Sequence, residues 1–327
     1  MARQRRPRLA IVGLGLIGGS LGLALKSAGS DYEIIGHNRH YEAAGQAMKA
    51  GAVDRAEWNL PRAVDEADVV VVAVAPRAIE TVFRDIAPYL RPGTIVTDVG
   101  STKVDVLAWA ESILPSHADF VGGHPMAGKE LSGIAAADAA LFRGATYCIV
   151  SGTRSTARGI DTVAAIARAV GARPYFLEAA EHDSYVAAVS HVPFIAAASL
   201  VGAVSAAPGW TDMARLAAGG FRDSTRTASA DVDMHTDICL TNREAIVQRL
   251  DQLLATLADV RQSVTAGDED AIRQFFLSAK ETRDQWLANR VIPPGAAAVL
   301  PMPERPGLSE LLFGGLGRNR RDRDASQ

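Results

Sequence analysis

His124 stands in a stretch of sequence whose residue types could support proton transfer. Gly122 and Gly123 let backbone and ligand approach closely, and Pro125 stiffens the chain directly after the imidazole. A histidine of ordinary pKa is largely neutral near pH 7, so it can take a proton from a substrate hydroxyl. A tight turn with an incidental histidine explains the stretch by itself more simply. We interpret it as an active-site loop if the chain also supplies a cofactor and a substrate site.

Two arginines, Arg222 and Arg226, lie in a polar segment at residues 219–227 that begins with two glycines. We expect this segment to be a loop between helices. A guanidinium group can bind a carboxylate through two parallel hydrogen bonds, which suits a substrate that carries acidic groups. A surface ion pair is the alternative for either side chain, because that is the usual environment of an arginine.

A dinucleotide site is predicted near the start of the chain. Residues 8–13 form an apolar, strand-like run that leads into a glycine-rich turn and then a helical pattern. In this order the glycines turn the chain, admit a pyrophosphate and pack the helix against the strand, while the helix N-terminus attracts the anion. A glycine-rich turn in some other βαβ unit is the alternative. The residues that we expect at the cofactor are Gly13, Gly15, Leu16, Ile17 and Gly18.

The end of the second expected strand, residues 33–36, bears on the choice of cofactor. An NAD site usually has Asp or Glu here, whereas this chain continues with His37, Asn38, Arg39 and His40. Arg39 could pair with a 2′-phosphate, and no carboxylate is present to repel it. We therefore expect NADP rather than NAD, with use of both possible. Arg39 and His40 could equally be solvated loop residues.

The alternation of strands and helices continues to about residue 178 and predicts a Rossmann-type, doubly wound α/β sheet. An uninterrupted apolar strand such as residues 67–74 is typical of a parallel sheet that helices cover on both faces. Because the carboxyl ends of parallel strands share one edge, Ala75, Ser101 and His124 should lie along one crevice with the glycine turn. Cys148 is expected in the core. Further strands are expected at residues 94–98, 119–121, 146–150 and 174–177.

The second half of the chain changes character. Strand patterns give way to long helical segments at residues 179–205, 242–265 and 268–289, the first interrupted at His191 to Pro193. The first segment is apolar on nearly every side, which favours packing against a second subunit. We predict a nucleotide-binding domain at 1–178, an all-helical dimerisation and substrate domain at 179–292, and a proline-rich, loosely ordered tail at 293–327.

Composition narrows the class of protein. The 327 residues are 48% hydrophobic and 22% charged with a net charge of −3, so nucleic acid is not an expected partner. No run long enough to cross a bilayer is free of glycine, proline and charge. The two cysteines cannot make a disulfide framework, and the scattered histidines give no support to a metal site. We expect a cytoplasmic homodimer that acts on a small molecule.

Five motifs together resemble one family, the prephenate and arogenate dehydrogenases of tyrosine biosynthesis. The resemblance covers about residues 8–290 and implies a Rossmann domain, a helical dimerisation domain and an active site at their junction. It also implies oxidative decarboxylation of prephenate with NAD(P)+ to give 4-hydroxyphenylpyruvate and CO2. The motifs, in the family's order, are GLGLIGGSLGLAL, DVGSTK, GGHPMAGKELSG, SHVPF and GGFRDSTR.

The resemblance assigns roles to residues by motif. It makes His124 the catalytic base for the substrate's ring hydroxyl and places Ser101 beside that base or hydroxyl. It makes His191 a substrate-site histidine and Arg226 a carboxylate-binding arginine. Prephenate has two carboxylates, so a second cation should be needed. Our own candidates for it are Lys129 and Arg222.

Several alternatives stay open at this stage. The acidic residue missing after the second strand leaves NAD or NADP undecided, and His235 stands where many members carry an aromatic, so arogenate could replace prephenate. A 3-hydroxyacid dehydrogenase-type reductase would share the architecture, but it uses a lysine of the helical domain, and none occurs between Lys129 and Lys280. A dimer that binds nucleotide without catalysis is the third alternative.

Overall fold

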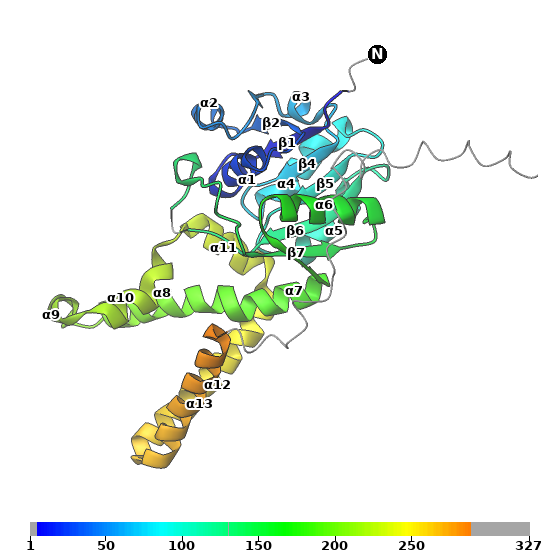
Figure 1. The fold of residues 1–327 in the computed structure, drawn as a ribbon. Coiled ribbons are helices and arrows are strands. Elements are labelled where there is room, and N and C mark those ends of the chain that lie inside the picture. Colours follow the sequence, from blue (N-terminus) through cyan, green and yellow to red (C-terminus); the bar gives the residue numbers. More distant parts are fainter. Residues whose placement is uncertain (1–4, 130, 289–327) are drawn as a thin grey trace, which may run out of the picture. The chain divides into compact units, whose positions relative to one another are not determined.

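The computed structural model describes residues 5–129 and 131–288. The chain forms two compact units, which meet in the sequence between Ile246 and Val247 (Figure 1). The boundary predicted at residue 178 lies within the first unit and stays a prediction. The tail predicted at residues 293–327 lies outside the described residues.

An eight-stranded sheet organises the first unit, in the order β3-β2-β1-β4-β5-β6-β7-β8. Strands β1 to β6 pair in parallel, β7 runs antiparallel to β6, and β8 is parallel to β7. The strand order reverses beside β1, which is where open α/β sheets bind their ligands. The strands are β1 Arg8–Val12, β2 Glu33–His37, β3 Arg55–Ala56, β4 Val69–Val72, β5 Ile95–Asp98, β6 Asp119–Pro125, β7 Thr146–Ser151 and β8 Arg173–Leu177.

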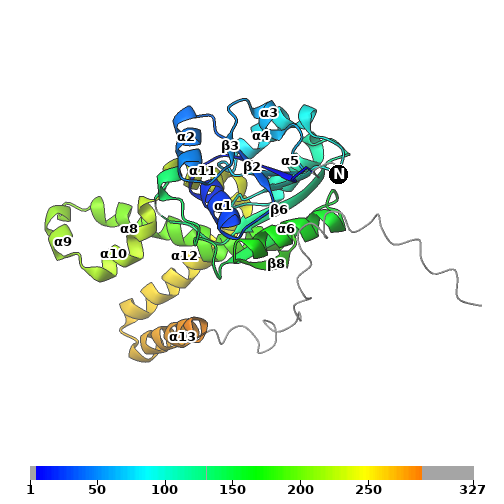
Figure 2. The ribbon, with the colours of Figure 1, turned by 45° about the horizontal axis from the view of Figure 1, so that its top comes forward.

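Helices cover both faces of this sheet (Figure 1, Figure 2). Successive residues of β4 face opposite sides, so Val69 and Val71 join one apolar cluster while Val70 and Val72 join the other. Helices α1, α2 and α6 pack on the first cluster and α3, α4 and α5 on the second. The predicted doubly wound α/β fold is thus confirmed. The helices are α1 Leu16–Ser27, α2 Tyr41–Lys49, α3 Leu60–Val64, α4 Ala78–Ile86, α5 Val104–Ile113 and α6 Ala157–Ala169.

Strand β6 corrects one prediction, because His124 lies in the strand and not in a loop after it. The antiparallel neighbour β7 pairs with β6 as far as Pro125 and places His124 opposite Cys148, which is buried as expected. The glycine before the histidine serves packing: a Cβ at Gly123 would lie 2.6 Å from the carbonyl oxygen of Asp98. This glycine therefore admits a neighbouring strand rather than a ligand.

Short and long helices complete the first unit. A π-helical turn, Ala187–His191, joins α7 to α8, so the expected interruption near Pro193 is a bulge within a continuous helical run. Residues 219–225, predicted as a loop, form a helix in which Ser224 and Thr225 donate hydrogen bonds to carbonyl groups four residues earlier. The helices are α7 Ala179–Val186, α8 Val192–Ser205, α9 Trp210–Leu216, α10 Gly219–Thr225 and α11 Val232–Thr241.

The run Ala179–Ser205 is long and apolar enough to cross a membrane when judged by length and composition alone. Core helices of other proteins pass the same test. One third of its most apolar window is buried in the protein, and Asp183 within the run is buried and hydrogen-bonded to α5. We therefore treat the run as part of the fold.

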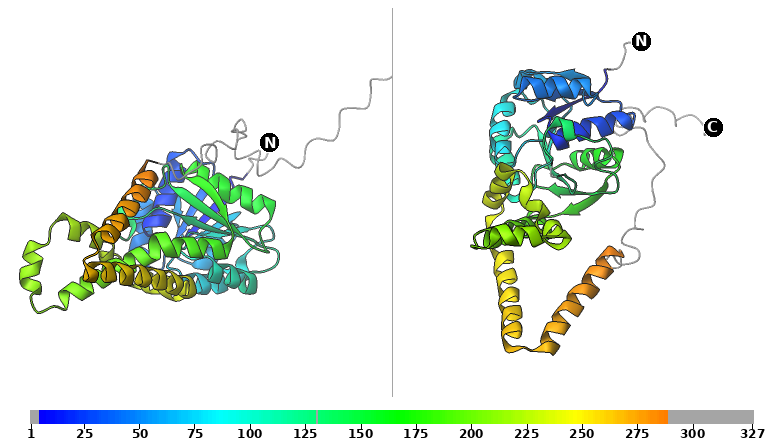
Figure 3. Two further views of the ribbon diagram at one scale, coloured as in Figure 1. Left: turned by 90° about the horizontal axis from the view of Figure 1, so that it is seen from below. Right: turned by 90° about the vertical axis from the view of Figure 1, so that its left-hand side faces the viewer.

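The described part of the second unit is a helical hairpin of α12 Arg243–Ala266, whose first turn belongs to the first unit, and α13 Glu269–Leu287. The turn between them contains Gly267 with φ of 66°, a conformation that suits glycine. The two helices diverge from this turn (Figure 3). Between them lies a groove of about 900 Å³, and its apolar lining includes Val260, Ile272, Phe275 and Trp286.

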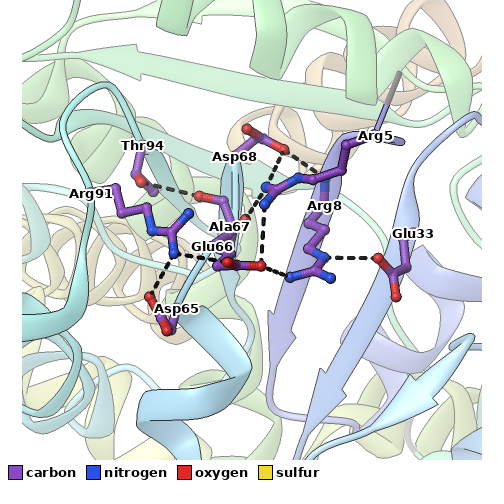
Figure 4. A network of polar contacts seen from close by, with 9 residues as sticks. All are labelled: Arg5, Arg8, Glu33, Asp65, Glu66, Ala67, Asp68, Arg91 and Thr94. Carbon is purple, nitrogen blue, oxygen red and sulfur yellow. Dashed lines mark hydrogen bonds and ion pairs between the residues drawn. The ribbon is translucent and has the colours of Figure 1, made fainter. Parts of the chain in front are cut away.

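An ionic network secures the start of β1 (Figure 4). Glu66 accepts from Arg8, Arg5 and Arg91, and Arg8 also pairs with Glu33 at 2.8 Å. Arg8 and Glu33 begin β1 and β2, and Glu66 and Arg91 lie shortly before β4 and β5. The network is therefore at the amino ends of these strands, opposite the carboxyl ends at which open sheets bind ligands. We assign the network to the stability of the fold.

Candidate active site

Three buried side chains form a hydrogen-bonded series that ends at His124. Asp183 Oδ1 lies 2.7 Å from His182 Nδ1, and His182 Nε2 lies 2.9 Å from His124 Nδ1. A carboxylate only accepts, so His182 carries its proton on Nδ1 and its Nε2 must accept from His124. His124 therefore carries its proton on Nδ1. Its Nε2 is left with a free lone pair, which is what a general base requires.

Asp183 also joins two parts of the first unit. Its carboxylate accepts from the backbone N–H groups of Lys103 at 2.8 Å and Val104 at 2.9 Å, which begin α5. Helix N-termini leave such N–H groups without partners inside the helix, and an acidic side chain satisfies them well. The same residue thus holds α7 against α5 and orients His182.

A second buried pair lies beside the histidines. Lys103 Nζ is 2.5 Å from Asp98 Oδ2, and neither side chain is exposed to solvent. Asp98 also accepts from the backbone of Gly100 at 2.7 Å and of Gly123 at 3.1 Å. Because Asp98 ends β5 and Gly123 lies in β6, the pair fixes the strand that carries His124.

Burial keeps the histidines of this series uncharged. Burial is the main reason why the pKa of His124 lies well below 6.5, and the neighbouring His182, Lys103 and His191 lower that pKa further. The pKa of His182 is also lowered, chiefly by burial, against the opposing hydrogen bond to Asp183. Both imidazoles are accordingly neutral near pH 7, as proton acceptance by His124 requires.

His191 lies close to this series, since its charge would lower the pKa of His124. Its Nδ1 faces Asn242 Nδ2 at 3.1 Å, and burial lowers its own pKa to about 4. Phe194 stacks on His235 with ring centroids 3.8 Å apart. Two residues that the family pattern singles out, His124 and His191, are therefore brought together next to an aromatic pair.

The other residues expected at the substrate are placed differently. Ser101 is half-buried between β5 and α5, and within the described ranges the hydrogen-bond partner of His124 Nδ1 is His182. Arg226 is exposed at the start of a short helical turn. Lys129 pairs with Asp138 at 3.0 Å, and the largely exposed Arg222 lies 3.6 Å from Asp223. Their roles toward a substrate stay predictions.

The glycine turn fits a dinucleotide. Gly13 has φ of 102°, and a Cβ there would lie 2.2 Å from the carbonyl oxygen of Ala73. A Cβ on Gly18 would lie 1.9 Å from the carbonyl oxygen of Gly13, whereas one on Gly15 would meet nothing within 4 Å. Only the middle glycine therefore faces open space, where a diphosphate could approach the start of α1. Leu16 begins that helix, whose N-cap has no side-chain hydrogen bond, and Ile17 follows it.

The loops that should meet the rest of the cofactor are also defined. Asn38 Oδ1 accepts from the backbone of His40, and the exposed Arg39 donates to the His40 ring at 3.2 Å. Ala75 is exposed after β4. In the same loop, the backbone of Arg77 donates to Asp237 of α11 at 3.2 Å. Arg39 is exposed at the surface.

Sequence reasoning missed five residues that build this site. Asp98 and Lys103 belong to the DVGSTK motif, whose two charged ends were a usable signal for a buried pair. A histidine–aspartate pair at 182–183, at the start of an otherwise apolar helix, was a second signal. Nothing in the sequence around Asn242 distinguishes it from a surface asparagine. The five are Asp98, Lys103, His182, Asp183 and Asn242.

Comparisons with known proteins match most of the chain to one family. Residues 21–176 match the family model for the prephenate dehydrogenase nucleotide-binding domain, and residues 178–278 match that for the prephenate dehydrogenase dimerization domain. Prephenate dehydrogenase of Bacillus subtilis (strain 168) is 34% identical over 309 residues, covering 93% of this chain and 83% of that protein.

Two solved structures resemble the fold closely. Prephenate dehydrogenase from A. aeolicus in complex with hydroxyphenyl propionate and NAD+ is 25% identical, with a TM-score of 0.80 over 87% of this chain and 99% of that one. Synechocystis arogenate dehydrogenase is 26% identical, with a TM-score of 0.73 over 85% and 99% of the two chains.

Proposed function

This chain belongs to the prephenate dehydrogenase family, an NAD(P)-dependent group of oxidoreductases that carry out oxidative decarboxylation, and we propose that its own substrate is prephenate. The products are then 4-hydroxyphenylpyruvate, CO2 and the reduced cofactor. The observation that carries the proposal is the series Asp183–His182–His124, which leaves a lone pair on Nε2 of a buried, neutral histidine.

His124 accepts the proton of the substrate's ring hydroxyl and later returns it. Its Nε2 accepts that proton as hydride leaves the carbinol carbon, and the positive charge formed on the imidazole is stabilised by the hydrogen bond that Nδ1 donates to His182. The nicotinamide, when bound, accepts the hydride. Loss of CO2 then leaves its electron pair in the ring, which becomes aromatic. His124 returns the proton to the phenolate oxygen, and its lowered pKa favours that return.

The remaining substrate contacts are proposals that rest on the family pattern. Ser101 would hydrogen-bond the ring hydroxyl beside His124, and Arg226 would bind a carboxylate. Lys129 or Arg222 would then exchange its acidic neighbour, Asp138 or Asp223, for the second carboxylate. Prephenate is favoured over arogenate because the Bacillus subtilis relative carries the name prephenate dehydrogenase, while the Synechocystis neighbour is an arogenate dehydrogenase.

NADP is the proposed cofactor. The residues after β2 include Arg39 and no carboxylate, a composition that tolerates a 2′-phosphate. The A. aeolicus neighbour was solved with NAD+, so use of that cofactor by this chain is the competing possibility.

A cytoplasmic homodimer completes the proposal. The hairpin α12–α13 offers an apolar groove and exposed Leu254, Phe276 and Trp286, which a second copy of the chain would cover. This hairpin falls largely within the residues matched by the dimerization-domain model. The two free cysteines, Cys148 and Cys239, suit a reducing compartment. We retain the predicted division into domains 1–178 and 179–292.

The function is tested by a spectrophotometric assay. Prephenate and arogenate are each offered with NAD+ and NADP+, and the absorbance of the reduced nicotinamide is followed. The proposal predicts the highest kcat/KM for prephenate with NADP+. A lack of signal in all four mixtures, with folded protein, would overturn the activity, and preference for arogenate or NAD+ would overturn that part alone.

A further inference from the structure

Asn242 is held in one orientation by two acceptors. Its Nδ2 lies 2.8 Å from the backbone carbonyl oxygen of Asp183 and 3.1 Å from Nδ1 of His191. A carbonyl oxygen only accepts, so the side-chain amide must direct its NH2 group here, since an amide oxygen would face another oxygen. One N–H then serves Asp183 and the other serves His191.

The orientation of Asn242 decides which nitrogen of His191 is protonated. Because Nδ1 receives a hydrogen bond, it must carry the lone pair, and the proton of the neutral ring must be on Nε2. That Nε2 is buried and has no hydrogen-bond partner within the described part of the chain. The His191 side chain as a whole is 1% exposed. A buried donor without a partner is uncommon in folded proteins and points to a bound group that completes it.

We propose that Asn242 is a positioning residue that fixes His191 as the Nε2–H tautomer, and that this N–H binds a carboxylate or keto oxygen of the substrate. Both kinds of oxygen only accept hydrogen bonds, so a fixed donor matches them and excludes a hydroxyl that needs an acceptor. The identity of the bound oxygen rests on the proposed function, whereas the tautomer does not.

In this proposal one histidine of the site is a hydrogen-bond acceptor and the other is a donor. His124 presents a lone pair on Nε2 and His191 presents Nε2–H, and Asp183 determines both tautomers. Its side chain acts through His182 on His124, and its main-chain carbonyl acts through Asn242 on His191. The substrate's hydroxyl, which must give up a proton, is therefore directed to His124, and its carboxylate or keto oxygens, which accept a hydrogen bond, are directed to His191.

The charged and titratable groups around His191 leave it neutral. Burial is the largest cause of its lowered pKa, Asp183 opposes the change, and His182 and His235 reinforce it. His191 accordingly donates from an uncharged ring at neutral pH.

The substitution Asn242→Asp tests whether donation by Asn242 fixes the tautomer of His191, because it replaces the NH2 group by an oxygen with little change of shape. A carboxylate can only accept from Nδ1, so His191 must either move its proton to Nδ1 or become charged. Protein labelled with 15N-histidine reports this directly by NMR. The His191 signals are assigned by comparison with His191→Asn. In the unsubstituted protein, Nδ1 should give the signal of an unprotonated ring nitrogen and Nε2 that of a protonated one.

Activity supplies the second readout. Where Asn242→Asp exchanges the two signals, the Nε2–H donor is lost, and KM for prephenate should rise about tenfold with a smaller change in kcat. Where it protonates both nitrogens, the Nε2–H donor remains, and KM should not rise. Thr241→Val is the matched control: it removes the 3.0 Å bond from Thr102 at the preceding position and should leave both readouts unchanged. In Asn242→Ala, nothing should fix the proton of His191 on Nε2, and KM for prephenate should rise as well.

Two results would overturn the inference. One is a proton on Nδ1 of His191 in the unsubstituted protein, and the other is an unchanged KM in Asn242→Asp when the signals have exchanged. If the unsubstituted protein fails to turn over prephenate at all, the proposed function is wrong, and the NMR signals still decide the tautomer.

Discussion

Nδ1 of His124 and Nε2 of His182 lie 2.9 Å apart, and this bond joins two rings that are both buried. Two neutral imidazoles can share a hydrogen bond only if one donates and the other accepts. Asp183 makes that choice, because its carboxylate accepts a hydrogen bond from Nδ1–H of His182 and so keeps the proton of that ring on Nδ1. Asp183 thus determines which nitrogen of His124 is protonated, although it acts only through His182.

Asp183→Asn should weaken the series. Oδ1 accepts from the backbone N–H of Lys103 as well as from His182 Nδ1, so the amide oxygen should keep that place and the NH2 group should face the Val104 N–H. Because a neutral amide stabilises the imidazolium formed during proton transfer less than a carboxylate does, we expect kcat to fall roughly tenfold or more. Stopped-flow or steady-state rates with prephenate measure it, and cofactor binding by fluorescence should be preserved. Asp237→Asn, on α11, is the matched control, and equal loss in both variants would refute the series.

Activity should persist in mildly acidic solution. The base must be neutral, so activity is present above the pKa of His124 and disappears as the pH falls through it. Because that pKa is held well below 6.5, kcat/KM should stay level from pH 7.5 to below 6.5. A pH–rate profile that loses activity around pH 6.5 would mean that His124 is not buried and neutral, or is not the base.

Folding stability should decline in the same range. A histidine whose pKa is lower in the folded protein binds fewer protons in the folded than in the unfolded chain. The free energy of unfolding therefore decreases as the pH falls below 6.5. For His191 the pKa moves from 6.5 to about 4. This difference amounts to ~3 kcal/mol by pH 4, as an order of magnitude. Urea unfolding at pH 7 and pH 5 measures it, and His191→Gln should flatten the dependence. An identical slope in that variant would contradict the assignment.

Arg39→Ala should weaken NADP+ selectively. Loss of a guanidinium–phosphate contact should raise KM for NADP+ about tenfold or more, with little change for NAD+. Initial rates with each cofactor at saturating prephenate show the difference. Arg168→Ala, an exposed arginine of α6, is the control. Equal changes for the two cofactors would remove Arg39 from the phosphate site.

Phe275→Asp should interfere with dimer formation. Phe275 lines the groove between α12 and α13, and a charge there would be costly to bury against a second copy. Light scattering after size-exclusion chromatography should show a dimer for the unsubstituted chain and for Arg261→Ala, but a monomer for Phe275→Asp. A monomeric unsubstituted chain would contradict the proposed homodimer.

The features that sequence predicted were local ones. The apolar run of β4, the glycines between β1 and α1, and the helical patterns of the second half each depend on neighbours along the chain. The site itself depends on long-range pairs: His124 and His182 are 58 residues apart, and Asn242 and Asp183 are 59 apart. Neither spacing has a local pattern, so only the fold could reveal the two series.

Two predictions of secondary structure were wrong because they relied on the local sequence alone. His124 was predicted in a loop because its flanking glycines favour turns, but pairing with β7 extends β6 through it. Residues 219–225 were predicted as a loop from their two glycines and polar side chains, but they form a helix that lies against α8. In both places, contacts made in the folded chain outweigh the local preference of glycine.

The turnover of His124→Asn with prephenate tests the central claim most directly. The substitution removes the Nε2 lone pair in a side chain of related shape, so kcat should fall by about two to four orders of magnitude, the range for loss of a positioned base. Cofactor binding, followed by fluorescence, should persist. Near-normal turnover in His124→Asn, with intact folding and cofactor binding, would show that His124 is not the base.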